Sequence, residues 1–302
     1  MQSNETVIPF SRILRWYFLF LTGLAILSML LFLTFRMFAS DPFYDHVLGS
    51  VLTFVDGEFI TYVGIGFLAQ MIDGALGMAY GVSSTSFLMS VGVSPAVASA
   101  SVHAAEVVTS GLSGLSHWKF GNVTKDLFYR LALPGAIGAA AGAYILTSID
   151  GDQIKPYVSA YLLLMGIVIL AKAMRKSFAS KPFKRLRLLA LFGGFVDASG
   201  GGGWGPVVTS TLIGSGRSPR FTIGTVNAVE FIVAATATGI FSVFVGLESW
   251  NVILGLIMGG AFAAPLGAYF CSKVKVRTLM TLVGVLIVAL SIRTIIKSFG
   301  LM

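Results

Sequence analysis

The chain has 302 residues, of which 56% are hydrophobic and only 11% are charged, and its net charge is +8. Apolar runs long enough to cross a bilayer make up most of the sequence, which excludes a soluble globular protein. The basic residues stand in short loops between these runs, where they are typical of topology signals, so the positive charge does not indicate nucleic-acid binding.

The first predicted element is a retained transmembrane helix over 16–38. It follows Arg12 and Arg15 and is too long for the core of a signal peptide. Eight further apolar segments are expected, over 59–92, 95–116, 131–149, 157–174, 188–215, 221–246, 250–270 and 278–297. Glycine interrupts the segments 59–92 and 188–215 near their middle. The pattern predicts an all-α polytopic membrane protein.

The two interrupted segments are similar to each other. One contains Asp73-Gly-Ala-Leu-Gly-Met-Ala-Tyr-Gly81, and the other, 124 residues later, contains Asp197-Ala-Ser-Gly-Gly-Gly-Gly-Trp-Gly205. The match continues to Glu106 and Glu230. We therefore expect an N-terminal helix and external loop over 1–58, a first repeat over 59–174, a basic cytoplasmic linker over 175–187 and a second repeat over 188–302. Such a duplication is typical of transporters whose site lies between two repeats.

The positions of lysine and arginine choose between topologies. If both interrupted segments are re-entrant hairpins and the N-terminus is cytoplasmic, 17 of the 21 basic residues lie inside; if both segments span, only 8 do. If only the first interrupted segment is a hairpin, 14 basic residues still lie inside, so the second segment could instead be a kinked span. We favour two hairpins, each followed by three spans. The repeats then enter the membrane from opposite sides and are inverted.

A half-helix is expected to begin after each interruption, and its free amides and positive partial charge favour an anion. The alternative is that glycine only permits close helix packing, as we expect for Gly138, Gly142, Gly255 and Gly259. Four consecutive glycines favour the anion site, because each would cost about 1 kcal/mol in a continuous helix. The predicted substrate-binding residues are Gly77, Gly81, Ser83, Ser84, Thr85, Gly201, Gly202, Gly203, Thr209 and Ser210.

Four carboxylates are predicted at membrane depth, where an ionisable group indicates function by default. Asp73 and Asp197 precede the glycine runs, and either bind loop amides or take part in the transport cycle. Glu106 and Glu230 follow His103 and Asn227 by three residues, which places each pair on one helix face. A His–Glu pair titrates near neutral pH, and a purely structural pair is the alternative. The candidate coupling or gating residues are Asp73, His103, Glu106, Asp197, Asn227 and Glu230.

At these residues the chain resembles the TauE/SafE family, also called sulfite exporter-like or TSUP proteins, over about 59–299. The resemblance is carried by Asp73–Gly81, Asp197–Gly205, the Ser94-Pro95 and Ser218-Pro219 turns and the polar pairs that follow. The first repeat departs from the glycine-rich form at Leu76, Met78, Ala79 and Tyr80. The resemblance implies a secondary transporter in the cytoplasmic (inner) membrane that moves a small anion, such as sulfite or an organosulfonate, with export as the expected direction.

Other functional classes fit less well, and we expect neither an enzyme nor a cofactor. Asp197-Ala-Ser199-Gly200 is superficially similar to the serine motif of membrane proteases, but a single dyad with His103 would not explain the duplication. His46, His103 and His117 are scattered and Cys271 is the only cysteine, so no metal site is predicted. An anion channel and a proton-coupled importer stay open, as do the substrate, the coupling ion and association into a homo-oligomer.

Overall fold

The computed structural model describes Gly49 and residues 55–76, 78–119, 121–174, 183–246, 249–273 and 276–299. The predicted helix over 16–38 and residues 175–182 of the predicted linker lie outside these ranges. The chain forms two compact units, Met1–Glu58 and Phe59–Met302, and the following description concerns the second.

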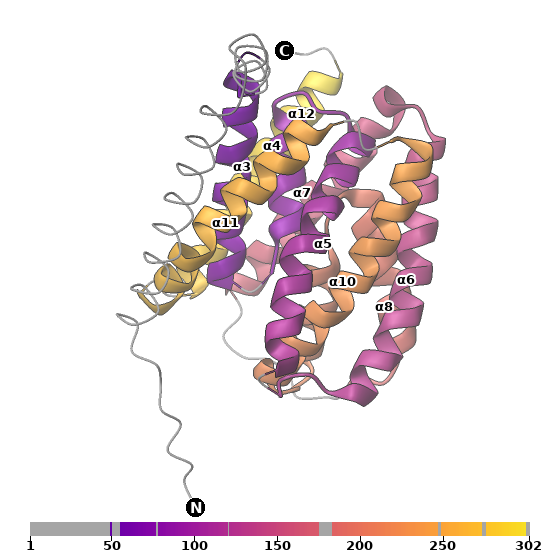
Figure 1. The fold of residues 1–302 in the computed structure, drawn as a ribbon, viewed down its shortest axis with the longest axis vertical. Helices are drawn as coiled ribbons and strands as arrows, with labels where there is room; N and C mark the ends of the chain where they lie inside the picture. The colour runs from indigo at the N-terminus through magenta and orange to yellow at the C-terminus, as the bar shows by residue number, and fades with distance from the viewer. Residues whose placement is uncertain are drawn as a thin grey trace, which may run out of the picture. The chain divides into compact units, whose positions relative to one another are not determined.

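The described residues form helices and no strands, which confirms the all-α prediction. In chain order the elements are α3 (Gly57–Leu76), α4 (Tyr80–Ser90), α5 (Pro95–Lys119), α6 (Lys125–Ser148), α7 (Gly151–Met174), α8 (Leu186–Gly200), the π-helix η1 (Gly205–Thr209), α9 (Ser210–Gly214), α10 (Pro219–Phe244), α11 (Trp250–Lys273) and α12 (Val276–Ser298) (Figure 1). Among the residues that the structure describes, four helical stretches are long and apolar enough to cross a membrane: Lys125–Ser148, Gly151–Met174, Pro219–Phe244 and Met280–Ser298.

Both glycine segments interrupt a helix, as predicted. The first break separates α3 from α4, and the second separates α8 from η1. Gly201 and Gly202 have φ values of 70° and 142°, which glycine adopts at little cost and other residues rarely adopt. The amide of Gly202 donates to the carbonyl oxygen of Asp197 at 2.8 Å, which closes the end of α8. Pro206 then stands in the first turn of η1, where its missing donor costs nothing.

Close helix contacts fix the direction of each interrupted segment. A Cβ on Gly255 would lie 2.7 Å from Tyr62 Cβ, and one on Gly259 would lie 2.0 Å from the carbonyl oxygen of Val63 and 2.6 Å from the amide of Phe67. Positions further along α11 therefore contact positions further along α3, so these two helices run in parallel. Because the starts of α5 and α11 line one pocket, the segment α3–α4 begins and ends at one end of the unit (Figure 1).

The second interrupted segment is arranged in the same way at the opposite end. A Cβ on Gly138 would lie 2.0 Å from the carbonyl oxygen of Leu191, and one on Gly142 would lie 2.2 Å from that of Phe195. These contacts make α6 and α8 parallel and confirm that both glycines serve close packing. The start of α10 joins the loop before α6 through Arg220 Nε, which donates to Asn122 Oδ1 at 2.7 Å. The segment α8–α9 thus begins and ends where α6 and α10 begin.

The charges of the two ends differ. The end at which α6, α8 and α10 begin, here called the basic end, carries Lys119, Lys125, Lys184, Arg185, Arg187, Arg217 and Arg220. The opposite end, where α7 begins and α12 ends, carries Asp150 and Asp152 together with Lys155 and Lys297. Between the ends, helices of the two halves pack on each other, α5 on α10, α6 on α8 and α7 on α12. This packing brings both interruptions into the interior of the unit.

Candidate functional site

The two interruptions meet. A Cβ on Gly202 would lie 2.2 Å from the amide nitrogen of Val82, and one on Gly81 would lie 2.8 Å from Gly202 Cα. Thr85 Oγ1 donates to the carbonyl oxygen of Gly201, and Tyr161 Oη donates to that of Gly202 at 2.7 Å. The tip of the second half is therefore held by two hydrogen bonds from the first half, one from α4 and one from α7.

The remaining predicted substrate-binding residues surround this contact. Gly81, Ser83, Ser84, Thr85, Gly201, Gly202, Gly203 and Thr209 are buried, and Ser210 is half-buried. Gly77 lies outside the described residues. Ser210 Oγ donates to Met78 Sδ at 3.4 Å, a further link between the two interruptions. Ser83 Oγ is buried and has no hydrogen-bond partner within the described part of the chain.

Each aspartate binds an amide beyond its own break. Asp197 Oδ1 accepts a hydrogen bond from the backbone nitrogen of Trp204 at 2.8 Å. Asp73 likewise accepts one from the backbone of Tyr80. Tyr80 and Trp204 each stand seven residues after the aspartate and at the start of a half-helix. Both carboxylates therefore stabilise the restart of the helix, which is the structural role considered for them from the sequence.

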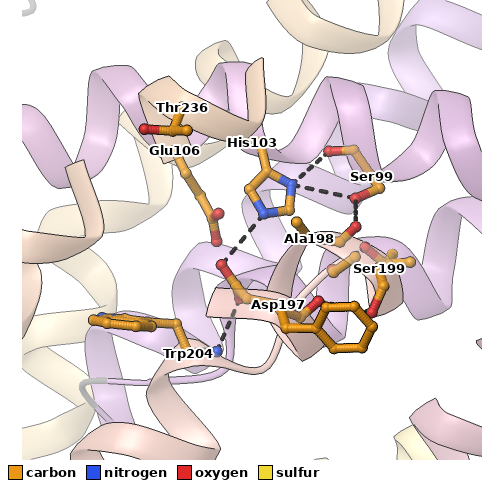
Figure 2. A network of polar contacts seen from close by, with 12 residues as sticks. Ser99, His103, Glu106, Asp197, Ala198, Ser199, Trp204 and Thr236 are labelled. Atoms are coloured by element: carbon orange, nitrogen blue, oxygen red, sulfur yellow. Dashed lines mark hydrogen bonds and ion pairs between the residues drawn. The ribbon is translucent and has the colours of Figure 1, made fainter. Parts of the chain in front are cut away.

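His103 joins α5 to the end of α8 (Figure 2). Its Nδ1 lies 2.7 Å from the carbonyl oxygen of Ser99 and 3.3 Å from Ser99 Oγ. Its Nε2 lies 3.3 Å from Asp197 Oδ2, and both side chains are almost completely buried. Ser99 Oγ donates to the carbonyl oxygen of Ala198 at 2.8 Å. The ionisable partner of His103 is thus Asp197 from the other half, and not Glu106 as the three-residue spacing suggested.

Glu106 faces a cavity that we call the acidic cavity. It has an empty volume of about 410 Å³ and is lined by Gln70, Asp73, Tyr80, Glu106, Thr109, Ser110, Ser113, Asn227 and Glu230. Three of these side chains are carboxylates, and no lysine or arginine is among them. Asn227 Nδ2 donates to Ser113 Oγ at 3.0 Å, so Asn227 bridges α10 to α5 and has a partner other than Glu230. The structure therefore places four of the six predicted coupling residues in the lining of the cavity, and it places His103 and Asp197 beside Glu106.

The comparisons with known proteins agree with a membrane transporter. The model of the family described as sulfite exporter TauE/SafE matches residues 62–294. The chain belongs to the TauE/SafE family. It is 45% identical over 252 residues to the "Probable membrane transporter protein YtnM" of Bacillus subtilis (strain 168), and the alignment covers 80% of this chain and 84% of the relative. It is 25% identical over 259 residues to a "Probable membrane transporter protein" of Xylella fastidiosa (strain Temecula1 / ATCC 700964), and that alignment covers 80% of this chain and 97% of the relative. No solved structure matches the chain.

Membership of the TauE/SafE family decides the class of function. The chain is a multi-pass membrane transporter and not an enzyme, which removes the intramembrane hydrolase from consideration. Ser199 agrees with this conclusion, because its Oγ donates to the carbonyl oxygen of Phe195 at 2.7 Å whereas His103 contacts Ser99 and Asp197.

Among the described residues, one group of side chains brings together atoms of the kind that bind metal ions. Atoms of His103, Glu106 and Asp197 lie within 4.8 Å of one another, and all three residues are buried. His103 and Asp197 are direct hydrogen-bond partners in this TauE/SafE chain, so we assign the group as a polar network.

Several contacts of the site were not predicted from the sequence. Ser99 binds both His103 and Ala198. Its position one helical turn before His103 could have indicated the contact with His103 from the sequence. Tyr161 is a single tyrosine in an apolar run and gave no signal for its bond to Gly202. Lys172, in the last turn of α7, donates from Nζ to the carbonyl oxygen of Pro206 at 2.7 Å, so an ammonium group reaches the first turn of η1.

Proposed function

We propose that this transporter is a secondary carrier that exports a small sulfur-containing anion, sulfite or an organosulfonate, across the cytoplasmic (inner) membrane. The observation that carries the proposal is the meeting of two interrupted helices inside the unit, with Gly81 against Gly202. α4 begins at Tyr80 and the helical stretch Gly205–Gly214 begins beside it, so two helix N-termini lie at this contact. Helix N-termini bind anions through free amides and positive partial charge.

We assign the two halves as inverted repeats that work by alternating access. In support, α8–α9 begins and ends at the basic end, whereas α3–α4 begins and ends at the opposite end. The positive-inside rule places the basic end in the cytoplasm. The contact between Gly81 and Gly202 then separates the two sides of the membrane, and opening it toward either side exposes the substrate site.

The hydroxyl groups near the tips would complete the anion site. Ser83 Oγ is buried and unpaired, and it stands on the first turn of α4, where helix amides are also unpaired. In the other half, Thr209 and Ser210 correspond to Thr85 and Ser86 at the 124-residue offset of the repeats. The tip contacts made by Thr85 and Tyr161 fill the space between the breaks, so the anion enters only when these contacts open.

Proton-coupled import is the second candidate, and the acidic cavity favours it. Asp73, Glu106 and Glu230 line the cavity, where their ionised forms would repel an anion. Protonation of these carboxylates would remove the repulsion and link anion movement to proton movement. Export from an electrically negative cytoplasm needs no coupling ion, whereas import works against about 2.3 kcal/mol per charge per 100 mV.

Purified protein in liposomes with sulfite on one side tests these proposals. A carrier gives saturable flux and counterflow, and an imposed inside-negative potential accelerates sulfite efflux. Flux that rises linearly with concentration and shows no counterflow would identify a channel. Accumulation of sulfite driven by a proton gradient would select the importer, and absence of sulfite flux alongside flux of an organosulfonate would change the substrate.

A further inference from the structure

The contact between His103 and Asp197 contains two hydrogen-bond acceptors unless an additional proton is present. His103 Nδ1 lies 2.7 Å from the carbonyl oxygen of Ser99, which is only able to accept, so Nδ1 carries a hydrogen. The hydroxyl hydrogen of Ser99 is directed to the carbonyl oxygen of Ala198 and is not available to the ring. A neutral imidazole has one N–H group, so Nε2 is left as an acceptor.

Nε2 faces Asp197 Oδ2 at 3.3 Å, and an ionised carboxylate also only accepts. The His103 and Asp197 side chains are 0% and 3% exposed, so water does not compensate an unpaired negative charge there. Either His103 is an imidazolium or Asp197 is a carboxylic acid. Both alternatives contain one proton more than neutral histidine beside an ionised aspartate.

We propose that the His103–Asp197 contact is a binding site for one dissociable proton, and that this proton is the coupling ion of the transport cycle. The proton bridges Nε2 and Oδ2 when bound, and its release leaves two acceptors that repel each other. The site itself follows from the hydrogen-bond geometry, whereas its coupling role rests on the proton-coupled candidate of the proposed function, because uncoupled export needs no such ion.

Glu106 supplies the exchange route for this proton. Its carboxylate approaches the ligand atoms of His103 and Asp197 within 4.8 Å, and it also lines the acidic cavity. Its Oε2 atom is buried and has no hydrogen-bond partner within the described residues, and Figure 2 shows the carboxylate directed toward His103 and Asp197. A proton leaving Nε2 or Oδ2 thus has an acceptor beside it that opens on the cavity.

Charged and titratable groups face this network from the neighbouring helices. Glu106 lies on α5 with His103, and Asp197 lies on α8. Within the described part of the chain, the further groups are Asp73 on α3, Tyr80 on α4, Tyr161 on α7 and Glu230 on α10, and Lys172 of α7 lies beyond the break at Pro206. The carboxylates among them carry like charges, which favour retention of a proton somewhere in the network.

Proton release would act on the second tip through Asp197. Asp197 uses Oδ1 to hold Trp204 and its carbonyl oxygen to hold Gly202, so it fixes both sides of the break. Ser99, on the same helix as His103, holds Ala198. Loss of the proton weakens the connection between α5 and α8 at the point where Gly202 meets Gly81, which links proton binding to opening of the tips.

Asp197→Asn provides the sharpest test. Asparagine keeps an oxygen that accepts from Trp204 and adds an N–H group that donates to His103 Nε2, so the hydrogen bonds persist without a titratable proton. Full-length protein labelled with 15N-histidine, in lipid nanodiscs and without substrate, is titrated from pH 5 to 9 by NMR. The His103 line is assigned by its loss in His103→Gln.

The titration midpoint of His103 should fall by about one pH unit or more in Asp197→Asn, because the carboxylate that favours the proton is gone. Asp126→Asn is the matched control, since Asp126 pairs with Arg130 on the exposed face of α6 and should leave the midpoint unchanged. The same midpoint in the wild type and Asp197→Asn would overturn the proton site. A stoichiometric transition metal that co-purifies with the wild type and is lost in His103→Gln would also overturn it.

If Asp197→Asn does not fold, the melting temperature of His103→Gln tests the proton site instead. The melting temperature of His103→Gln should be furthest below that of the wild type at low pH, and the difference should shrink as the pH rises through proton release. A deficit that is constant from pH 5 to 9 would contradict the proposal.

Transport in liposomes then tests the coupling role separately. The wild type should move protons and sulfite in a fixed ratio, and Asp197→Asn should move sulfite without protons. Sulfite flux without proton flux in the wild type would overturn the coupling role, even if the NMR titration supports the site. Absence of any sulfite flux would contradict the proposed substrate, and the NMR titration would still decide the proton site.

Discussion

Gly202 and Gly81 touch through their backbones, so the two interrupted helices are separated by no side chain at their closest point. A Cβ on Gly202 would lie 2.2 Å from Val82 N and 2.3 Å from Gly81 C. Opening of this contact would uncover the backbone of both breaks where they face each other, while Tyr161 of α7 also covers the second break.

Gly202→Ala should lower the thermal stability of the protein and reduce sulfite transport by at least about tenfold. The added methyl group overlaps backbone atoms, and alanine is strained at a φ of 142°, for a combined cost of about 2–4 kcal/mol. Membrane insertion should be unaffected. Gly239→Ala is the control, because a Cβ there meets nothing within 4 Å. Unchanged transport by Gly202→Ala would show that the tips are not in contact in the working protein.

Thr85→Val should destabilise the contact between the two breaks by about 1–2 kcal/mol. The substitution conserves shape, but it leaves the buried carbonyl oxygen of Gly201 without the donor that Thr85 Oγ1 supplies. Melting curves compare it with Thr281→Val, whose hydroxyl is exposed and only binds its own helix at Arg277. Equal melting temperatures for the two variants would assign the Thr85 bond no net stabilising effect.

Accessibility of single cysteines should reveal both hairpins. In a Cys271→Ser background, cysteines replacing Glu58 and Ser94 should react with an impermeant maleimide added to whole cells. Cysteines replacing Lys184 and Ser218 should react only after permeabilisation. All four positions are exposed, so burial does not confuse the result. Opposite accessibility within either pair would show that the corresponding interrupted segment spans the membrane.

Glu106→Gln should distinguish export from proton-coupled import. An exporter should keep sulfite binding and show only a modest change in rate, because the membrane potential drives efflux without a coupling ion. An importer should lose uphill uptake and retain sulfite exchange. Proton uptake that is stoichiometric with sulfite entry in the wild type, and lost in Glu106→Gln, would exclude the export model.

The sequence predicted the features that depend on local composition. The interruptions at Asp73–Gly81 and Asp197–Gly205 follow from the backbone preferences of glycine, and the packing role of Gly138 and Gly142 follows from their lack of a side chain. The π-helical start of the segment Gly205–Gly214 was not predicted, because packing around the break rather than residue preference selects a wider turn there.

The hydrogen-bond partners of the buried polar groups could not be predicted from the sequence, for a different reason. Helical spacing relates residues on one element, so it paired His103 with Glu106 and left Asp197 as a separate aspartate. The observed bond joins residues 94 positions apart and depends on how α5 crosses α8. Tyr161 and Gly202 are related in the same way, through the position of α7.

The glycine contacts of α6 and α11 determine which parts of the molecule move together. Gly138 and Gly142 seat α6 against the backbone of α8, and Gly255 and Gly259 seat α11 against the backbone of α3. Sliding within either couple would drive backbone atoms into each other, so we expect each couple to move as one body. Each body combines a helix from the first half of the chain with one from the second. The mechanical units of this transporter are therefore mixed, and the boundary between them does not follow the boundary between the duplicated halves.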